Sequence, residues 1–159
     1  MIRSLVPEDC DALDDLVDSI SVFNTEEKII AKEVIAEASL SFNSKIFPPY
    51  KILVNLHENK IIGYICYGET PIAQDTYDLY WMATHPFYQG RGIGKELILA
   101  IIEDLKERNG RIIRVETSGL SYYAKTREFY IKNNFEECGR IKNFYKEGDD
   151  LVIYTYSLL

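Results

Sequence analysis

The sequence predicts a mixed α/β fold in which helices flank a central β-sheet. Apolar residues recur at helical spacing in four segments, which we expect to form helices over residues 9–20, 24–40, 93–108 and 124–133. Short runs of β-branched and aromatic residues, bounded by turn residues, predict strands over 2–6, 51–57, 61–67, 77–83, 111–117, 135–145 and 151–158. The expected order of the elements is β-α-α-β-β-β-α-β-α-β-β, which supports a mixed α/β domain.

The first half of the chain begins with a strand that Pro7 ends. The helix after it is amphipathic, with apolar residues at Ala12, Leu13, Leu16, Val17 and Ile20. Asn24 and Glu27 have the spacing of a capping box, so we expect a second helix to begin there. Its apolar face consists of Ile29, Ile30, Val34, Ile35 and Ala38. Two strands around the turn 58–60 then form a predicted hairpin.

The second half begins with the strand 77–83. Strict alternation places Asp78, Tyr80 and Met82 on one face of this strand and Leu79, Trp81 and Ala83 on the other. The next helix has an apolar stripe of Ile93, Leu97, Ile98, Ile101, Ile102 and Leu105. Asn109 and Gly110 are expected to end this helix, and the turn 147–150 is expected to close a final hairpin.

Length and composition limit the possible classes of protein. A chain of 159 residues, 47% of them hydrophobic, suits one domain over residues 1–159. A net charge of −7 argues against a nucleic-acid partner, because such binding relies on clustered Lys and Arg. We expect no membrane partner and a cytoplasmic location, since no signal-peptide pattern or bilayer-long apolar run is present. No metal is expected, because the cysteines and histidines lack the spacing of metal ligands; they are Cys10, Cys66, Cys138, His57 and His85.

A glycine-rich turn, Gln89-Gly90-Arg91-Gly92-Ile93-Gly94, joins the strand 77–83 to the next helix. We expect positive φ angles at its glycines, and the helix start after them would offer unpaired N–H groups to a phosphate. A Walker loop is excluded because Glu96 follows Lys95 where Ser or Thr is required. A dinucleotide fingerprint is excluded because positions 95 and 97 are not glycine.

The pattern that does fit, Q-x-x-G-x-G, resembles the acyl-CoA pyrophosphate loop of the GNAT superfamily of N-acetyltransferases. Residues 79–86 resemble the family's central strand and the loop after it, and residues 126–135 resemble its late helix. Asn134 replaces the usual glycine there, and Asn also tolerates a left-handed helix end. The resemblance covers essentially the whole chain. It implies the acyl-CoA N-acyltransferase fold, with one mixed, mostly antiparallel sheet that splays between its fourth and fifth strands and is flanked by helices.

The same resemblance implies acetyl-CoA as co-substrate and suggests which residues bind it. Pantetheine would contact the backbone of Met82, Ala83 and Thr84. The pyrophosphate would lie against Gln89, Gly90, Arg91, Gly92, Ile93, Gly94 and Lys95. Arg91 is a stronger candidate for a phosphate contact than Lys95. Arg127, on the late helix, is expected to approach either the CoA phosphates or the acceptor.

Amide formation needs a neutral amine, a site for the oxyanion and a proton for the departing thiolate. Deprotonating an ordinary alkylamine at neutral pH costs about 4.6 kcal/mol, so a base is useful. Asp78 matches the carboxylate base of the histone-acetylating branch of the family, Glu116 is the rival base, and a water relay is a third route. Tyr130 matches the family tyrosine near the cofactor sulfur and is the candidate acid. A backbone N–H near Met82 or Ala83, where the family's strand bulges, would polarise the oxyanion.

The sequence leaves the acceptor open. Aromatic residues in the regions that shape the family's acceptor site are Phe23, Phe42, Phe47, Tyr50, Tyr122, Tyr123, Phe144 and Tyr145. The leading hypothesis is an N-acetyltransferase that acts on a primary amine of a small molecule. The alternatives are a protein N-terminal or lysine acetyltransferase and a non-catalytic acyl-CoA-binding sensor. The strand 151–158 also allows a homodimer.

Overall fold

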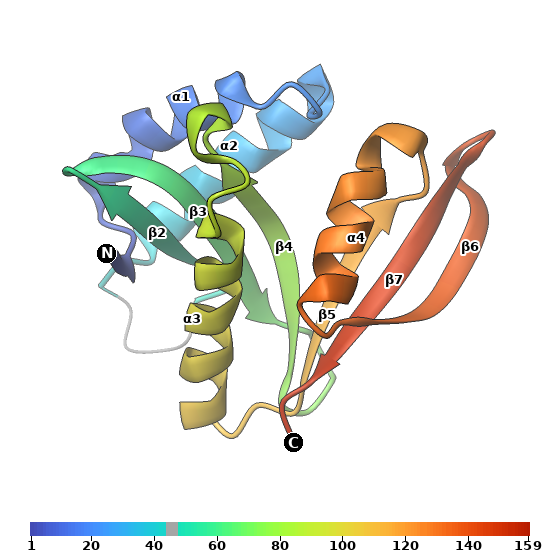
Figure 1. The fold of residues 1–159 in the computed structure, drawn as a ribbon. Coiled ribbons are helices and arrows are strands. Elements are labelled where there is room, and N and C mark those ends of the chain that lie inside the picture. Colours follow the sequence, from blue (N-terminus) through green and yellow to red (C-terminus); the bar gives the residue numbers. More distant parts are fainter. Residues whose placement is uncertain (44–47) are drawn as a thin grey trace.

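The computed structural model describes residues 1–43 and 48–159. A seven-stranded sheet lies between two pairs of helices (Figure 1). The strands are β1 (Ile2–Ser4), β2 (Lys51–His57), β3 (Lys60–Glu69), β4 (Thr76–Thr84), β5 (Ile112–Ser118), β6 (Glu136–Lys146) and β7 (Asp149–Ser157). The helices are α1 (Cys10–Ser19), α2 (Thr25–Leu40), α3 (Ile93–Glu107) and α4 (Ala124–Lys132). Short 3₁₀ turns occur at η1 (Pro7–Asp9), η2 (Pro86–Tyr88) and η3 (Ser121–Tyr123).

Every predicted helix and strand is present, and most bounds agree within one or two residues. The capping box is confirmed: Asn24 Oδ1 accepts from the Glu27 N–H at 2.9 Å, and Asn24 N–H donates to Glu27 Oε2 at 2.8 Å. Asn134 has φ of 65°, as expected for a left-handed helix end. None of the described helices is both long and apolar enough to cross a membrane.

The strand order is β1-β2-β3-β4-β5-β7-β6, and all neighbours are antiparallel except β4 and β5. The parallel pair β4 and β5 is short, since its register begins at Thr76↔Ile112 and ends at Leu79↔Val115. Beyond that point the two strands diverge, and the half of the molecule that contains α4, β6 and β7 leans away from the other half (Figure 1). The predicted mixed, mostly antiparallel and splayed sheet is therefore confirmed.

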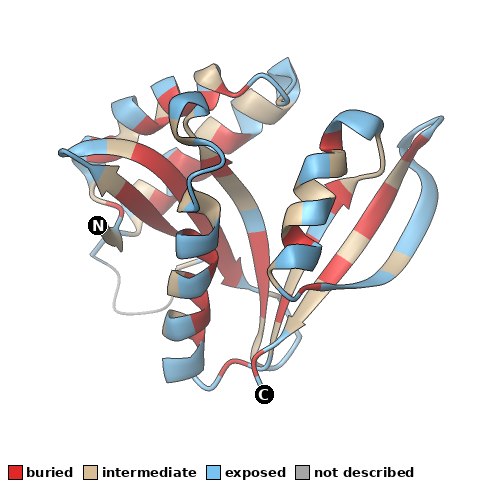
Figure 2. Cartoon of the chain, in the orientation of Figure 1, coloured by how far each residue is buried: buried red, intermediate tan, exposed pale blue. Residues whose placement is uncertain are grey.

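Two hydrophobic cores lie on opposite faces of the sheet. The core under α3 and α4 includes Leu97 and Ile101 from α3 and Tyr130 from α4. The core under α1 and α2 includes Leu13 from α1 and Ile35 from α2. In Figure 2 the helices turn their buried residues toward the sheet, whereas β6 at the sheet edge is almost entirely exposed.

A β-bulge in β4 corrects the predicted alternation of this strand. Cys66 of β3 pairs with Trp81 and Tyr67 pairs with Leu79, so Tyr80 is an extra residue with no partner. The extra residue reverses the alternation, and Leu79 and Met82 therefore pack in the core under α3 and α4, while Trp81 packs under α1 and α2. The prediction that Asp78 shares a face with Met82 is wrong for this reason, and the bulge lies earlier than the expected position at Met82 or Ala83.

Candidate active site at the splayed strands

The glycine-rich turn has the backbone conformation that its sequence requires at two positions. Gly90 has φ of 73° and Gly92 has φ of 86°, and a Cβ added to either would meet nothing within 4 Å. Crowding therefore does not explain these glycines. They are needed because side-chain-bearing residues are strained at such φ angles.

The start of α3 leaves a row of backbone donors free. Gly92 is the N-cap residue and its helix has no side-chain cap. The first intrahelical bond runs from the Glu96 N–H to the Gly92 carbonyl at 3.0 Å. Within the described residues, the N–H groups from Gly90 to Lys95 have no acceptor. A helix N-terminus with free donors and a partial positive charge suits a phosphate group.

The positive φ predicted for Gly94 is wrong. A Cβ at Gly94 would lie 3.1 Å from two ring carbons of Phe129 in α4. Real Cβ contacts are seldom so short, so this glycine permits close packing of the first turn of α3 against α4. This contact joins the two halves of the splayed sheet next to the free N–H groups.

The edge of β4 that faces the splay has lost its strand partner. The His85 N–H donates to the Ile62 carbonyl at 2.8 Å, so the backbone groups of His85 face β3. Successive residues of a strand direct their N–H and C=O groups to opposite sides. Those of Met82 and Thr84 therefore point to the side of β5, which no longer pairs with β4 here. Gln89 Nε2 donates to the Thr84 carbonyl at 3.3 Å and so holds the turn against the end of β4.

The cationic candidates near this edge differ in their partners. Arg91 and Lys95 are exposed and form no ion pair within the described part of the chain, and the Arg91 guanidinium lies 5.5 Å from the centre of the Tyr88 ring. Arg127 Nη1 donates to the carbonyls of Ser118 at 2.7 Å and Leu120 at 2.9 Å. The Arg127 side chain therefore braces the loop after β5 in this structure.

Tyr130 lies in the core beside the splay and is 5% exposed. Its ring packs against Phe129, Phe135 and Tyr154, with centroid distances of 5.6, 5.4 and 5.9 Å. Burial raises the pKa of the Tyr130 phenol well above its usual range, so the hydroxyl stays protonated. Within the described residues this hydroxyl has no hydrogen-bond partner, and it is free to donate to a ligand atom.

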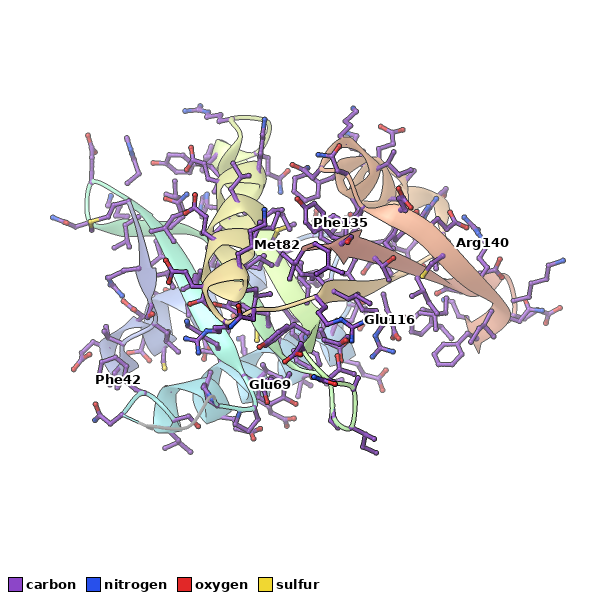
Figure 3. The ribbon with its side chains drawn as sticks, turned by 90° about the horizontal axis from the view of Figure 1, so that it is seen from below. Phe42, Glu69, Met82, Glu116, Phe135 and Arg140 are labelled. Carbon is purple, nitrogen blue, oxygen red and sulfur yellow. The ribbon has the colours of Figure 1, made fainter. Side chains whose placement is uncertain are left out.

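The two candidate bases lie on the other side of the sheet, near one arginine. Asp78 is 7% exposed, and Arg114 Nε donates to its Oδ1 at 2.6 Å. Glu116 Oε1 is 3.6 Å from Arg114 Nη1, and its side chain is 40% exposed. In Figure 3, Met82 lies between α3 and α4, whereas Glu116 lies on the side of the sheet that carries α2. The bulge at Tyr80 accounts for this separation.

Aromatic residues line the α2 side of the same region. Tyr80 packs edge-on against Tyr50 at 5.1 Å between ring centres, and Phe23 packs edge-on against Trp81 at 5.3 Å. Tyr145 is half-exposed, and its pKa is raised by burial and then by the carboxylates of Glu116, Asp149 and Glu27. The other aromatic candidates Phe42, Tyr122 and Phe144 are exposed, Tyr123 is buried, and Phe47 lies outside the described residues.

Three residues of this site were missed from the sequence. Trp81 faces α2 only because of the bulge, and no spacing in the sequence predicts a bulge. Alternation places Tyr80 on the face of Asp78, but nothing in the sequence marks that face as part of the site. Arg114 could have been found, because it alternates with Glu116 in an otherwise apolar strand, and opposite charges two residues apart share a face.

Comparisons with known proteins identify the family and the fold. A sequence model described as the Acetyltransferase (GNAT) family matches residues 16–135. A solved structure assigned to the GNAT family, from Desulfovibrio desulfuricans, has a TM-score of 0.92 and 34% identity over 100% of this chain and 99% of that chain. No curated protein sequence matches the chain.

Two more distant structures share the fold. The paia N-acetyltransferase from Thermoplasma acidophilum, in complex with coenzyme A, has a TM-score of 0.77 and 20% identity, over 99% of this chain and 98% of that chain. The ribosomal-protein-S18-alanine N-acetyltransferase from Escherichia coli has a TM-score of 0.75 and 20% identity, over 99% of this chain and 93% of that chain. At this level of identity the likeness shows the fold alone.

Replacing Gly92 tests whether the turn binds acetyl-CoA. Gly92→Trp should weaken acetyl-CoA binding by about ten-fold or more, because the indole would cover the free N–H groups. Gly148→Trp is the matched control, since Gly148 also has a positive φ, 81°, and open space for a Cβ, but lies in the β6–β7 turn. Calorimetric titration measures both affinities, and thermal melting checks that both variants fold. Wild-type affinity in folded Gly92→Trp would contradict the assignment of the loop.

Proposed function

The chain belongs to the GNAT family of acetyltransferases, which depend on acetyl-CoA, and from this premise we propose that it acetylates a primary amine of a small molecule by direct attack in a ternary complex. The observation that carries the proposal is the position of the free N–H groups at the start of α3, beside the unpaired edge of β4. The two features together suit a ligand that has a phosphate at one end and an extended amide chain at the other.

The described residues fit acetyl-CoA without further groups. The N–H groups of residues 90–95 would hold the pyrophosphate, and Arg91 and Lys95 would add positive charge. The backbone of Met82 and the N–H of Thr84 would pair with the pantetheine amides, as a strand partner does, whereas the backbone groups of Ala83 face β3 and are not available, contrary to the sequence prediction. When bound, acetyl-CoA supplies the thioester to be attacked. The Met82 N–H points into the splay and is our candidate donor to the oxyanion.

We assign the role of base to Glu116 in preference to Asp78. A carboxylate that binds a guanidinium at 2.6 Å must give up that ion pair to take a proton, which makes Asp78 a poor acceptor. Glu116 is more exposed and has a longer contact with the same arginine, so its oxygens are free to accept a proton directly or through a water molecule. Asp78 would instead hold Arg114 in place.

Tyr130 is the proposed donor to the sulfur. Because burial keeps its phenol protonated, its hydroxyl can donate a hydrogen bond to developing negative charge over the whole physiological pH range. Full transfer of the proton to the thiolate costs free energy, because the pKa of the phenol is raised. The same burial also disfavours a free thiolate, which offsets part of that cost.

The chemistry of the acceptor side supports a cationic amine. Aromatic rings and carboxylates attract an ammonium group, and Tyr80, Tyr145 and Glu116 provide both in one region. A net charge of −7 adds a weaker attraction at longer range.

Acceptor profiling tests the proposed function. The purified protein should bind acetyl-CoA in a calorimetric titration and should release free thiol when small primary amines are added. Release only with peptides that have a free N-terminus or lysine would replace the proposal with protein acetylation. Binding without release on any acceptor would favour a sensor, and absence of binding would overturn the proposal.

Glu116→Gln and Asp78→Asn should have different effects on turnover. Glu116→Gln should lower kcat at neutral pH by about 10²-fold or more, as expected for loss of a general base. The deficit in kcat should shrink as the pH rises toward the pKa of the amine, because hydroxide in solution then deprotonates the amine without help from the enzyme. Asp78→Asn should cost about ten-fold at most and show no such pH dependence. Thiol release against pH measures both profiles, and the opposite ranking would make Asp78 the base.

Tyr130→Phe removes one hydroxyl and keeps the aromatic packing. It should lower kcat by about 10-fold to 10²-fold with little change in acetyl-CoA affinity, since the donor is needed when charge develops on sulfur. Tyr154→Phe is the control, because this neighbour has the same chemistry and a similarly buried ring. Equal kcat values for both variants would remove Tyr130 from the mechanism.

A further inference from the structure

A hydrogen bond connects the two halves of the molecule on the side of the proposed acceptor site. The Tyr123 hydroxyl, in η3, lies 2.8 Å from Glu27 Oε1 and 3.3 Å from the Val22 carbonyl, both near the start of α2. Tyr123 and Glu27 are 96 residues apart in sequence. One belongs to the half that contains β5, β6 and β7, and the other belongs to the half that contains β1 to β4.

Both partners of this hydrogen bond are fixed in place. Glu27 Oε2 accepts from the Asn24 N–H in the capping box, so Oε1 is held toward Tyr123. Tyr123 is 9% exposed, and its pKa is raised first by burial and then by the hydrogen bond to Glu27, so it remains a donor. On its own side, η3 is braced by Arg127, which donates to the carbonyls of Ser118 and Leu120.

The two acceptors of the Tyr123 hydroxyl flank Phe23 in the sequence. Phe23 packs edge-on against Trp81 on the α2 side of β4, at 5.3 Å between ring centres. The hydrogen bond therefore holds the segment that carries Phe23, and it ties this aromatic pair to the half of the molecule that carries Glu116. At the base of the splay, Asp78 and Arg114 make a second contact between the halves, at 2.6 Å.

We propose that Tyr123 is a positioning residue for the acceptor: through Glu27 and Val22 it sets where Phe23 and Trp81 stand relative to Glu116. This inference rests on the proposed function for its kinetic consequence. Tyr123 need not touch the acceptor. Its loss leaves the acetyl-CoA loop intact, because η3 and the start of α2 contribute no residue to that loop.

Tyr123→Phe tests the inference, since it removes only the hydroxyl. The KM for the acceptor should rise by about ten-fold, the effect expected for one hydrogen bond to a charged group. The kcat and the acetyl-CoA affinity should stay within about two-fold of wild type. Tyr156→Phe is the matched control, because Tyr156 packs against Phe135 and the core under α3 and α4, away from Phe23 and Trp81. Glu27→Gln keeps an acceptor oxygen and the capping box and should give an intermediate KM.

A second readout separates this inference from the proposed function. Trp81 is the single tryptophan of the chain, so its fluorescence reports on its packing with Phe23. Quenching of Trp81 by acrylamide should increase in Tyr123→Phe and not in Tyr156→Phe, whether or not any amine is acetylated. Unchanged quenching, or increased quenching with unchanged acceptor KM, would overturn the positioning role. Thiol release absent from the wild type would instead overturn the proposed function.

Discussion

The early end of the pairing between β4 and β5 is the constraint on which the rest of the structure depends. Parallel strands normally continue side by side, but here the register stops at Leu79↔Val115 although both strands run further. Beyond Leu79, β4 remains paired with β3, but its backbone groups that face β5 lose their partners. Unpaired backbone groups are costly unless water or a ligand binds them. The open edge thus provides specific hydrogen-bonding sites next to the free N-terminus of α3.

The bulge at Tyr80 lies at the same point of β4 and gives the strand two different faces. Before the bulge, Leu79 packs under α3 and α4. After the bulge, Met82 packs under the same two helices and Trp81 faces α2. The sheet therefore separates the region proposed for the cofactor from the aromatic region proposed for the acceptor. They meet only where β4 and β5 part, which suits a direct attack of the amine on the thioester.

The sequence predicted the elements and the positive φ angles of Gly90 and Gly92 in the glycine-rich turn, because both depend on local spacing. The capping box at Asn24 and the helix end at Asn134 were readable from single residues for the same reason. The bulge could not be predicted from the sequence, since Tyr80 has no property that marks it as an extra residue. The Tyr123–Glu27 hydrogen bond could not be predicted either, because it joins residues 96 positions apart whose proximity depends on the whole fold.

Charge gives a further reason for this division of the site. The chain has a net charge of −7, yet the proposed co-substrate is an anion. Backbone N–H groups at a helix start resolve this conflict, because they attract a phosphate through fixed dipoles and need few charged side chains. On the other face of the sheet, carboxylates near the aromatic rings would attract the ammonium group of the proposed acceptor. An acidic protein can thus bind an anionic donor and a cationic acceptor, provided that the sheet keeps the two attractions apart.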